Sequence, residues 1–234
     1  MSAMAEALEV LLADNHLLVV AKPAGLPSVP DSSGDESLLE RAKAWVKERY
    51  CKPGAVFLGV VQRLDRPVSG ALVFARTSKA AARLAEALRE QRAEKVYWAL
   101  AEGEAPGPEG ELVQWLWKDE QHNKVHVCGR AREGAREART RWRVLARESG
   151  RTLYEFRPAS GRPHQLRVAA ATLGTPLLGD LKYGARAALA DQSIALHARE
   201  LGFEHPTRAE RVHCVAALPA LADWEPARRL LTRA

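Results

Sequence analysis

The stretch Gln62 to Ser78 reads QRLDRPVSGALVFARTS and joins a polar loop to an apolar strand. Its first half holds charged and turn-forming residues, whereas Ala71–Ala75 is apolar and typical of a buried strand. Asp65 lies between two arginines, Arg63 and Arg66. Neighbouring positive charge keeps such a carboxyl group ionised, and so available as a nucleophile or hydrogen-bond acceptor. The alternative is a loop aspartate in an ordinary surface ion pair, which contributes little to stability.

The pattern on both sides of this stretch predicts many strands and few helices. We expect strands at Leu17–Ala21, Phe57–Val61, Ala71–Ala75, Lys95–Ala101, Leu112–Trp117, Lys124–Cys128, Thr140–Ala146, Thr152–Arg157, Ile194–Leu201 and Arg211–Ala216. We expect helices at Ser37–Tyr50, Ser78–Arg92, Pro163–Leu173 and Trp224–Leu231, the third capped near Ser160 and ended by Gly174. The strands do not alternate regularly with helices, which predicts the α+β class with a largely antiparallel mixed sheet and flanking helices.

Length and charge bound the kind of protein. The 234 residues allow one large domain or two small ones; we expect a single domain, 1–234, in which Gly103–Gly110 (GEAPGPEG) is a surface loop and possibly a weak boundary. A hydrophobic share of 47% and a charged share of 27% exclude a disordered chain, a collagen and a coiled coil. The net charge of +6 favours an anionic partner, nucleic acid above all, although a basic protein without such a partner is equally compatible with it.

Cysteine spacing and hydropathy favour a cytoplasmic protein. Cys51, Cys128 and Cys214 are far apart and odd in number, which indicates reduced thiols rather than a disulfide framework. The first nine residues lack the pattern of a secretory signal. The longest apolar run, Leu17–Ala21, is far shorter than the roughly 20 residues that span a bilayer.

Metal and nucleotide sites find no support in the sequence. His122 and His126 are four residues apart with Cys128 nearby, but the predicted strand Lys124–Cys128 begins between the two histidines, so the helical i, i+4 geometry of a metal-binding pair does not apply. No glycine-rich phosphate loop is present. We therefore expect neither a metal nor a cofactor.

Two further segments hold candidate functional groups. Ser160 to Arg167 reads SGRPHQLR, a predicted helix start that is rich in hydrogen-bond donors and suited to a phosphate or carboxylate. The alternative is a basic helix start that is merely solvated. Tyr97 lies in the strand sequence KVYWAL, where packing is the commoner role of a tyrosine.

Together these segments resemble the RluA-type pseudouridine synthases. Gln62–Ser78 resembles the HRLDxxTSG signature of that family, and KVYWAL its motif with a tyrosine. SGRPHQLRV followed by GTPLLGDLKYG (Gly174–Gly184) resembles its GRxHQ[IL]R…P[IL]xGDxxYG segment. LLVVAKPAGLP (Leu17–Pro27) and ALHARELGFEHP (Ala195–Pro206) resemble its KPxG and LHAxxLxFxHP motifs. The motifs occur in the family's order and spacing across nearly the whole chain.

The resemblance implies a fold, a reaction and a set of catalytic residues. The fold is the pseudouridine synthase fold, with a sheet around a central RNA-binding cleft. The reaction breaks the N1–C1′ bond of a uridine in RNA, turns the uracil and rejoins it through C5. Asp65 would be the catalytic carboxylate, acting as nucleophile or base. Tyr97 would stack on the base and help to remove the C5 proton, and Arg167 would pair with Asp65. The reaction needs no metal or cofactor.

The same resemblance implies how RNA is held. Arg63 would fill the space that a flipped-out uridine leaves, and Arg66 and Arg162 would contact phosphates. Gln62, His164 and Gln165 complete the predicted substrate-binding residues; Gln62 replaces the family's usual histidine, so we expect altered RNA contacts there. The KPxG motif begins near residue 22, so we expect no N-terminal S4 domain. The predicted protein is then a monomer that acts on ribosomal or transfer RNA.

Two other functions stay open at this stage. One is an RNA-binding protein or chaperone without catalysis, which the presence of Asp65, Tyr97 and Arg167 disfavours. The other is an Asp-dependent glycosidase, which would release free uracil instead of rejoining it.

Overall fold

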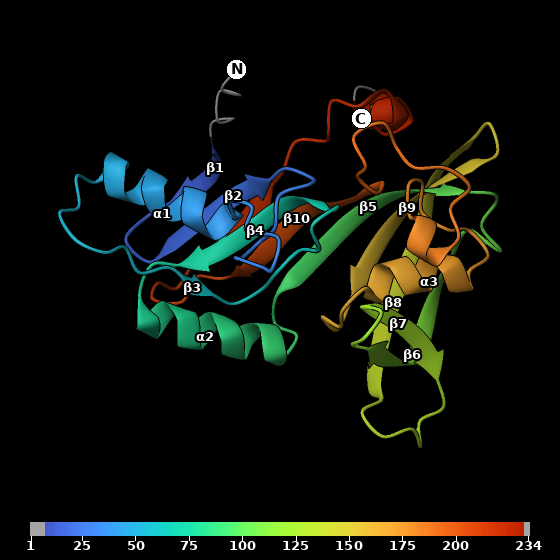
Figure 1. Ribbon diagram of the computed structural model, residues 1–234, viewed down its shortest axis with the longest axis horizontal. Coiled ribbons are helices and arrows are strands. Elements are labelled where there is room, and N and C mark those ends of the chain that lie inside the picture. Colours follow the sequence, from blue (N-terminus) through green and yellow to red (C-terminus); the bar gives the residue numbers. More distant parts are fainter. Residues whose placement is uncertain (1–7, 232–234) are drawn as a thin grey trace. The chain divides into compact units, whose positions relative to one another are not determined.

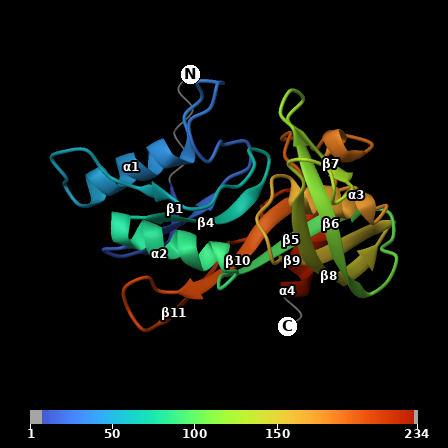
Figure 2. The same cartoon turned by 90° about the horizontal axis from the view of Figure 1, so that it is seen from below.

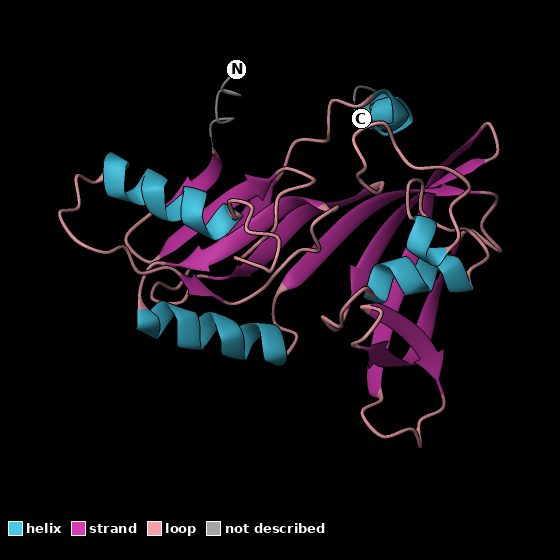
Figure 3. Ribbon diagram, viewed as in Figure 1, coloured by secondary structure: helices cyan, strands magenta, loops and turns pink. Residues whose placement is uncertain are grey.

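The computed structural model describes residues 8–231, and most of the N-terminal segment in which no secretory signal is expected lies outside this range. The described residues form eleven strands, four α-helices and two 3-10 helices, which confirms the α+β class (Figures 1 and 3). None of these helices is long and apolar enough to cross a membrane. The chain divides into two compact units, one made of Met1–Ala93 and Leu201–Ala217, the other of Glu94–Glu200 and Leu218–Ala234. That residues 1–234 act as one domain stays a prediction.

The first unit is a sheet with two helices. Its elements are β1 (Glu9–Ala13), β2 (Leu17–Lys22), α1 (Leu38–Arg49), β3 (Gly59–Val60), β4 (Ser69–Ala75), α2 (Ser78–Arg89), the part of β10 (Leu196–Glu204) from Leu201 onward, and β11 (Arg211–Val215). The strand order is β1-β2-β4-β10, with β3 pairing with β4 and β11 with β10. β2 lies antiparallel to both β1 and β4.

The strands β2 and β4 are buried on both faces, so they read as continuous apolar runs. Val19 and Val73 pack with Leu84 of α2 in one hydrophobic cluster. The alternate residues Leu18 and Phe74, which pair across the two strands, are buried on the opposite face. Figure 1 shows α1 and α2 on either side of these strands. The core therefore anchors the two ends of the loop that precedes β4.

The second unit is an antiparallel sheet with helices packed against it (Figure 2). Its elements are β5 (Glu94–Glu102), β6 (Glu109–Asp119), β7 (Lys124–Cys128), β8 (Arg136–Glu148), β9 (Arg151–Pro158), α3 (Gln165–Thr172), η1 (Leu181–Tyr183), the first part of β10, η2 (Ala222–Trp224) and α4 (Glu225–Leu231). The strand order β5-β9-β8-β6-β7 is antiparallel at every step, as the alternation of these strands predicts.

The register of this sheet separates two faces. Tyr97 pairs with Phe156, and Phe156 pairs with Trp142, so these three aromatic side chains share one face. Trp98 and Glu155, the neighbours in sequence, lie on the other face, where Trp98 packs in a cluster with Trp224 and Ala227. The predicted strand tyrosine is therefore on the face opposite that cluster.

Four expectations about local structure are wrong. The strand β1 was not predicted, because its short sequence is only partly buried and forms by pairing with β2 across a bulge. Of Phe57–Val61 only Gly59–Val60 is a strand, at a place where a side chain on Gly59 would come within 2.8 Å of Ala81 in α2. The loop at Gly103–Gly110 joins β5 to β6 inside the second unit and is no boundary.

The fourth concerns the start of α3. The helix begins at Gln165 after His164, whose left-handed φ of 50° turns the chain without a side-chain cap. Ser160 donates instead to the Gln165 side chain at 2.8 Å. The predicted stop at Gly174 is confirmed, since its positive φ follows the last turn.

Candidate active site

The loop that carries Asp65 is fixed from below by a buried lysine. Lys22, the last residue of β2, is 1% exposed, and its ammonium group donates three hydrogen bonds. The acceptors are the carbonyl oxygens of Leu26 at 2.6 Å, Pro23 at 2.9 Å and Arg66 at 3.1 Å. An ammonium group has three donors, so all of them are used. Lys22 thus joins the KPxG segment to the residue that follows Asp65.

A serine fixes the residue on the other side of Asp65. The Ser28 hydroxyl donates to the carbonyl of Leu64 at 2.7 Å and accepts from the Leu64 N–H at 3.1 Å. The Gly25 N–H donates to the Arg66 carbonyl at 2.9 Å. Both peptide neighbours of Asp65 are therefore bound to the segment that follows β2. The half-buried Asp65 belongs to a braced turn, in which the Val68 N–H donates to the Asp65 carbonyl at 3.0 Å.

The predicted RNA-binding side chains of this loop differ in their exposure and in the number of contacts that they make within the protein. Arg63 is exposed and makes no hydrogen bond or ion pair within residues 8–231, so its guanidinium group is available to a ligand. Gln62 is half-buried beside it. Arg66 donates to the Gly25 carbonyl at 2.9 Å and forms an ion pair with Asp35, so it is braced within the unit.

Burial and charge act against each other at Lys22. The pKa of Lys22 is lowered to about 7, and burial is the largest cause. The Asp65 carboxylate acts to raise this pKa, and the Arg66 guanidinium acts to lower it. The ordinary value of 10.5 applies to the unfolded chain. Below about pH 7 both states bind the proton; between about 7 and 10.5 the unfolded chain binds it more than the folded protein does. Stability therefore rises with pH across this window.

We expect Lys22→Met to remove this dependence. The free energy of unfolding of the wild type should rise relative to the variant by up to about 1.4 kcal/mol per pH unit above pH 7. Urea unfolding of both proteins across the window measures the difference. The control Lys47→Met, at an exposed position of α1, should follow the wild type. Parallel curves for wild type and Lys22→Met would contradict the assigned burial cost.

Tyr97 lies on the aromatic face of the second unit. Its cross-strand partner Phe156 stacks on Tyr154 with ring centroids 5.0 Å apart, and Trp142 meets Tyr154 edge to face at 5.8 Å. Tyr97 itself is half-buried, whereas Tyr154, Phe156 and Trp142 are buried. Lys95, on the same face, donates to the Ser160 carbonyl at 3.3 Å, and burial lowers the pKa of its amine. Of these aromatic rings, that of Tyr97 is the most accessible to a nucleobase.

Gln165 braces the loop before α3. Its amide nitrogen donates to the Arg139 carbonyl at 3.0 Å and to the Thr140 hydroxyl at 2.9 Å. Its amide oxygen accepts from Ser160 at 2.8 Å and from the Arg162 N–H at 3.1 Å. All four hydrogen-bonding positions of the buried amide are thus used by the protein. The geometry favours a positioning role for Gln165 over the predicted contact with RNA.

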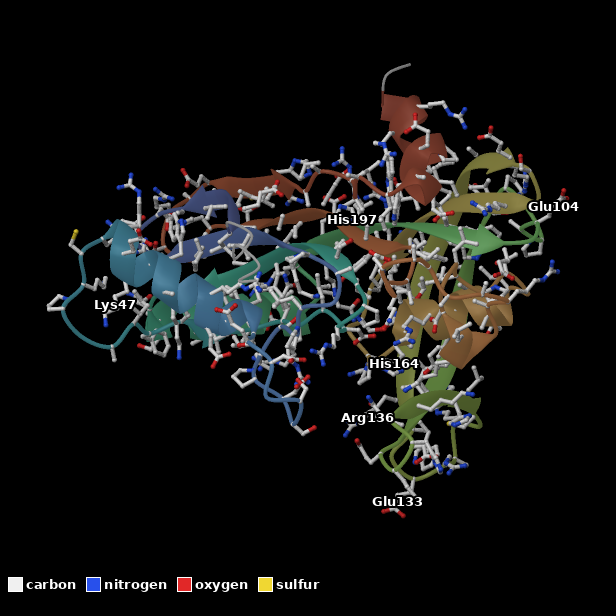
Figure 4. The ribbon with its side chains drawn as sticks, turned by 45° about the horizontal axis from the view of Figure 1, so that its top comes forward. Lys47, Glu104, Glu133, Arg136, His164 and His197 are labelled. Carbon is white, nitrogen blue, oxygen red and sulfur yellow. The ribbon has the colours of Figure 1, made fainter. Side chains whose placement is uncertain are left out.

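Arg162 and His164 lie on the outer side of this loop. Arg162 is exposed, and its Nε donates to the Glu137 carbonyl at 3.0 Å, which leaves most of the guanidinium group for a phosphate. His164 is half-buried and its Nδ1 lies 2.7 Å from the Tyr183 hydroxyl. Figure 4 shows the labelled His164 at the start of α3.

Arg167 is held by a buried aspartate. Its Nε and one terminal nitrogen each lie 2.7 Å from a different carboxylate oxygen of Asp180. Arg167 is 7% exposed and Asp180 1% exposed. Such a bidentate pair fixes the plane and direction of the guanidinium group. The predicted pairing of Arg167 with Asp65, a residue of the other unit, stays a prediction.

The sequence-based reading gave no role to three residues that the structure makes central. They are Lys22, Asp180 and Tyr183. All three fall inside motifs that carry the resemblance, KPAG and GDLKYG. The only sequence signal for Lys22 and Asp180 was a charged residue beside a glycine in each motif. Their partners, Arg66 and Arg167, lie in other motifs, so the sequence did not show these contacts.

A cavity of about 480 Å³ lies in the second unit away from Tyr97. Its lining includes Arg143 and Glu155, which share the sheet face opposite Tyr97. Three arginines and three glutamates line it, so it has no excess of positive charge to attract a phosphate. The lining of this cavity therefore does not indicate a phosphate-binding site.

Comparison with known proteins identifies the family. Residues 16–172 match the model of the RNA pseudouridylate synthase family. The chain is 38% identical over 197 residues to an RNA pseudouridine synthase of Zymomonas mobilis, covering 82% of this chain and 85% of that protein. It is 35% identical over 208 residues to the dual-specificity RNA pseudouridine synthase RluA of Pasteurella multocida, covering 87% and 90%.

A solved structure shows the same fold. Human RNA pseudouridylate synthase domain containing 4 superposes with a TM-score of 0.75 at 24% identity, over 91% of this chain and 89% of that one. The predicted pseudouridine synthase fold is thereby confirmed. The chain belongs to the RNA pseudouridylate synthase family and is an RluA-type catalytic domain.

Proposed function

We propose that this RNA pseudouridine synthase uses Asp65 as its catalytic carboxylate and acts on uridines of ribosomal or transfer RNA. The observation that carries the proposal is the bracing of Asp65: Lys22 and Ser28 fix the residues on both sides of this half-buried carboxylate. Pre-organisation of this kind is what a carboxylate needs to react at one position of a substrate.

In the proposed reaction the N1–C1′ bond of uridine breaks and a C5–C1′ bond forms. The proton on C5 is lost and N1 gains one, so the product is an isomer of the substrate. Tyr97 would lie against the extruded base, with the aromatic face of the sheet behind it. Arg167 would act on the Asp65 carboxylate, and Arg63 and Arg162, both exposed, would bind the RNA around the target.

The relatives support the proposed RNA class. The Pasteurella multocida relative is named a dual-specificity synthase, which supports a protein that accepts more than one RNA. We further infer that the protein works in the cytoplasm as a monomer.

The experiment is a tritium-release assay. Ribosomal and transfer RNA labelled with tritium at uracil C5 are incubated with the protein, and released tritium, free uracil and pseudouridine are measured. We expect tritium release with the base retained in the chain. Free uracil would favour a glycosidase instead, and RNA binding without release from any of these RNAs would contradict the proposed function.

A further inference from the structure

The hydroxyl group of Tyr183 joins two segments of the second unit. The Val125 N–H donates to this oxygen at 2.8 Å, and the Nδ1 atom of His164 lies 2.7 Å from it. The His164 and Tyr183 rings meet nearly at right angles, with centroids 5.7 Å apart. One phenol thus binds a strand of the sheet and the residue that opens α3.

Val125 lies in β7, the last strand of the order β5-β9-β8-β6-β7. Among the strands of residues 8–231, β7 pairs with β6 alone, so N–H groups on its outer edge need other partners. The Tyr183 hydroxyl supplies one at Val125. The side chain of Val125 packs with Val168 of α3 in a small cluster that Tyr183 also contacts. The β6–β7 hairpin is therefore bound to the α3 segment at this point through both polar and apolar contacts.

The ring of Tyr183 extends the same linkage to the arginine. The Arg167 guanidinium carbon lies 5.0 Å from the ring centroid, within the range of a cation–π contact. The Tyr183 N–H donates at 3.0 Å to the carbonyl of Asp180, whose carboxylate holds Arg167. Tyr183 touches His164 through its hydroxyl and Arg167 through its face.

We propose that Tyr183 is a positioning residue for the pseudouridine synthase reaction. Its hydroxyl locks the β6–β7 hairpin to the segment from His164 to Arg167, and its ring supports Arg167. This inference rests on the proposed function, in which Arg167 acts on the catalytic carboxylate. A displacement of about 1 Å in a group that must meet a reacting centre can cost about 100-fold in rate.

The variant Tyr183→Phe keeps the ring over Arg167 and removes both hydrogen bonds of the hydroxyl. We expect kcat for tritium release to fall about 10- to 100-fold, with KM for RNA changed less than about 3-fold. The matched control is Thr152→Val, which removes a buried hydroxyl of the same unit that donates to the Gly103 carbonyl at 2.8 Å and accepts from the Ala105 N–H at 3.2 Å. It should lower the melting temperature by a similar amount and leave kcat unchanged.

Two spectroscopic measurements test the lock without turnover. Hydrogen exchange of the Val125 amide should speed up in Tyr183→Phe while amides bonded within the β6–β8 ladder stay protected. The ¹⁵N resonances of the His164 ring should shift in Tyr183→Phe and not in Thr152→Val.

An unchanged kcat in Tyr183→Phe would overturn the proposal, and so would an equal loss in the control. A wild type that forms no pseudouridine would contradict the proposed function instead. Unchanged Val125 exchange and unchanged His164 resonances would overturn the lock whatever the activity.

Discussion

Asp65→Asn should reduce pseudouridine formation by at least about 10⁴-fold, because the amide has neither the charge nor the basicity that the reaction requires. The substitution keeps the size and shape of the side chain. The loop should keep its conformation, since its braces run through main-chain groups: Lys22 binds the Arg66 carbonyl and Ser28 the main chain of Leu64. The tritium-release assay measures the loss.

RNA binding should survive this substitution. The exposed arginines Arg63 and Arg162 are unaffected, so the dissociation constant should change by less than about 3-fold at fixed salt. The control is Asp31→Asn, an aspartate of the same unit whose carboxylate binds Ser33 in an exposed turn. It should retain full activity. Residual activity within about 10-fold of the wild type would remove Asp65 from its assigned role.

Asp180→Asn should lower both stability and activity. Asp180 is the buried bidentate partner of Arg167, and removing one charge of a buried pair costs about 3–5 kcal/mol. The neutral amide also offers only one acceptor atom where the carboxylate offers two. The guanidinium group of Arg167 would lose its fixed direction, and we expect kcat to fall more than about 100-fold.

The control for this prediction is Glu155→Gln. Glu155 is also buried and also accepts two hydrogen bonds from one arginine, Arg143, at 2.9 Å each. It lies on the sheet face opposite Tyr97. Glu155→Gln should lower the free energy of unfolding, but by less than Asp180→Asn does, because Arg143 is half exposed. Its kcat should stay near the wild-type value. Urea unfolding and tritium release on the same samples separate the two effects. If Asp180→Asn lost activity only in proportion to its unfolded fraction, Asp180 would be a structural residue alone.

The sequence predicts the sheet well where local pattern decides it. The strands β6 and β8 alternate between buried and more exposed residues, and this period identifies them without knowledge of their partners, whereas β5 and β9 are almost continuously buried. β1 and the short β3 depend on pairing and on close contact with α2, which no local pattern encodes. The left-handed turn at His164 likewise belongs to the contacts of Gln165 and Tyr183 rather than to the sequence around Ser160.

The candidate site divides in the same way. Asp65 and Tyr97 stand out by residue type and by their motifs, so they could be named from the sequence. The supports of the site could not, because Lys22 reaches a carbonyl 44 residues away and Asp180 reaches an arginine 13 residues earlier. Gln165 is a different case: its amide is fully used inside the protein, which no sequence pattern indicates, and its predicted contact with RNA stays a prediction.

The interleaved path of the chain has a consequence for synthesis. The first unit needs Leu201–Ala217, whose buried Phe203 and Val212 belong to its core. A ribosome that has released the first 93 residues has therefore delivered a sheet without the strand that follows β4 in its order. The edge of β4 therefore stays unpaired until residues 201–217 have been synthesised, and during this time it can pair with other chains. Nascent chains stalled between the two segments should be the stage at which this protein most needs a chaperone.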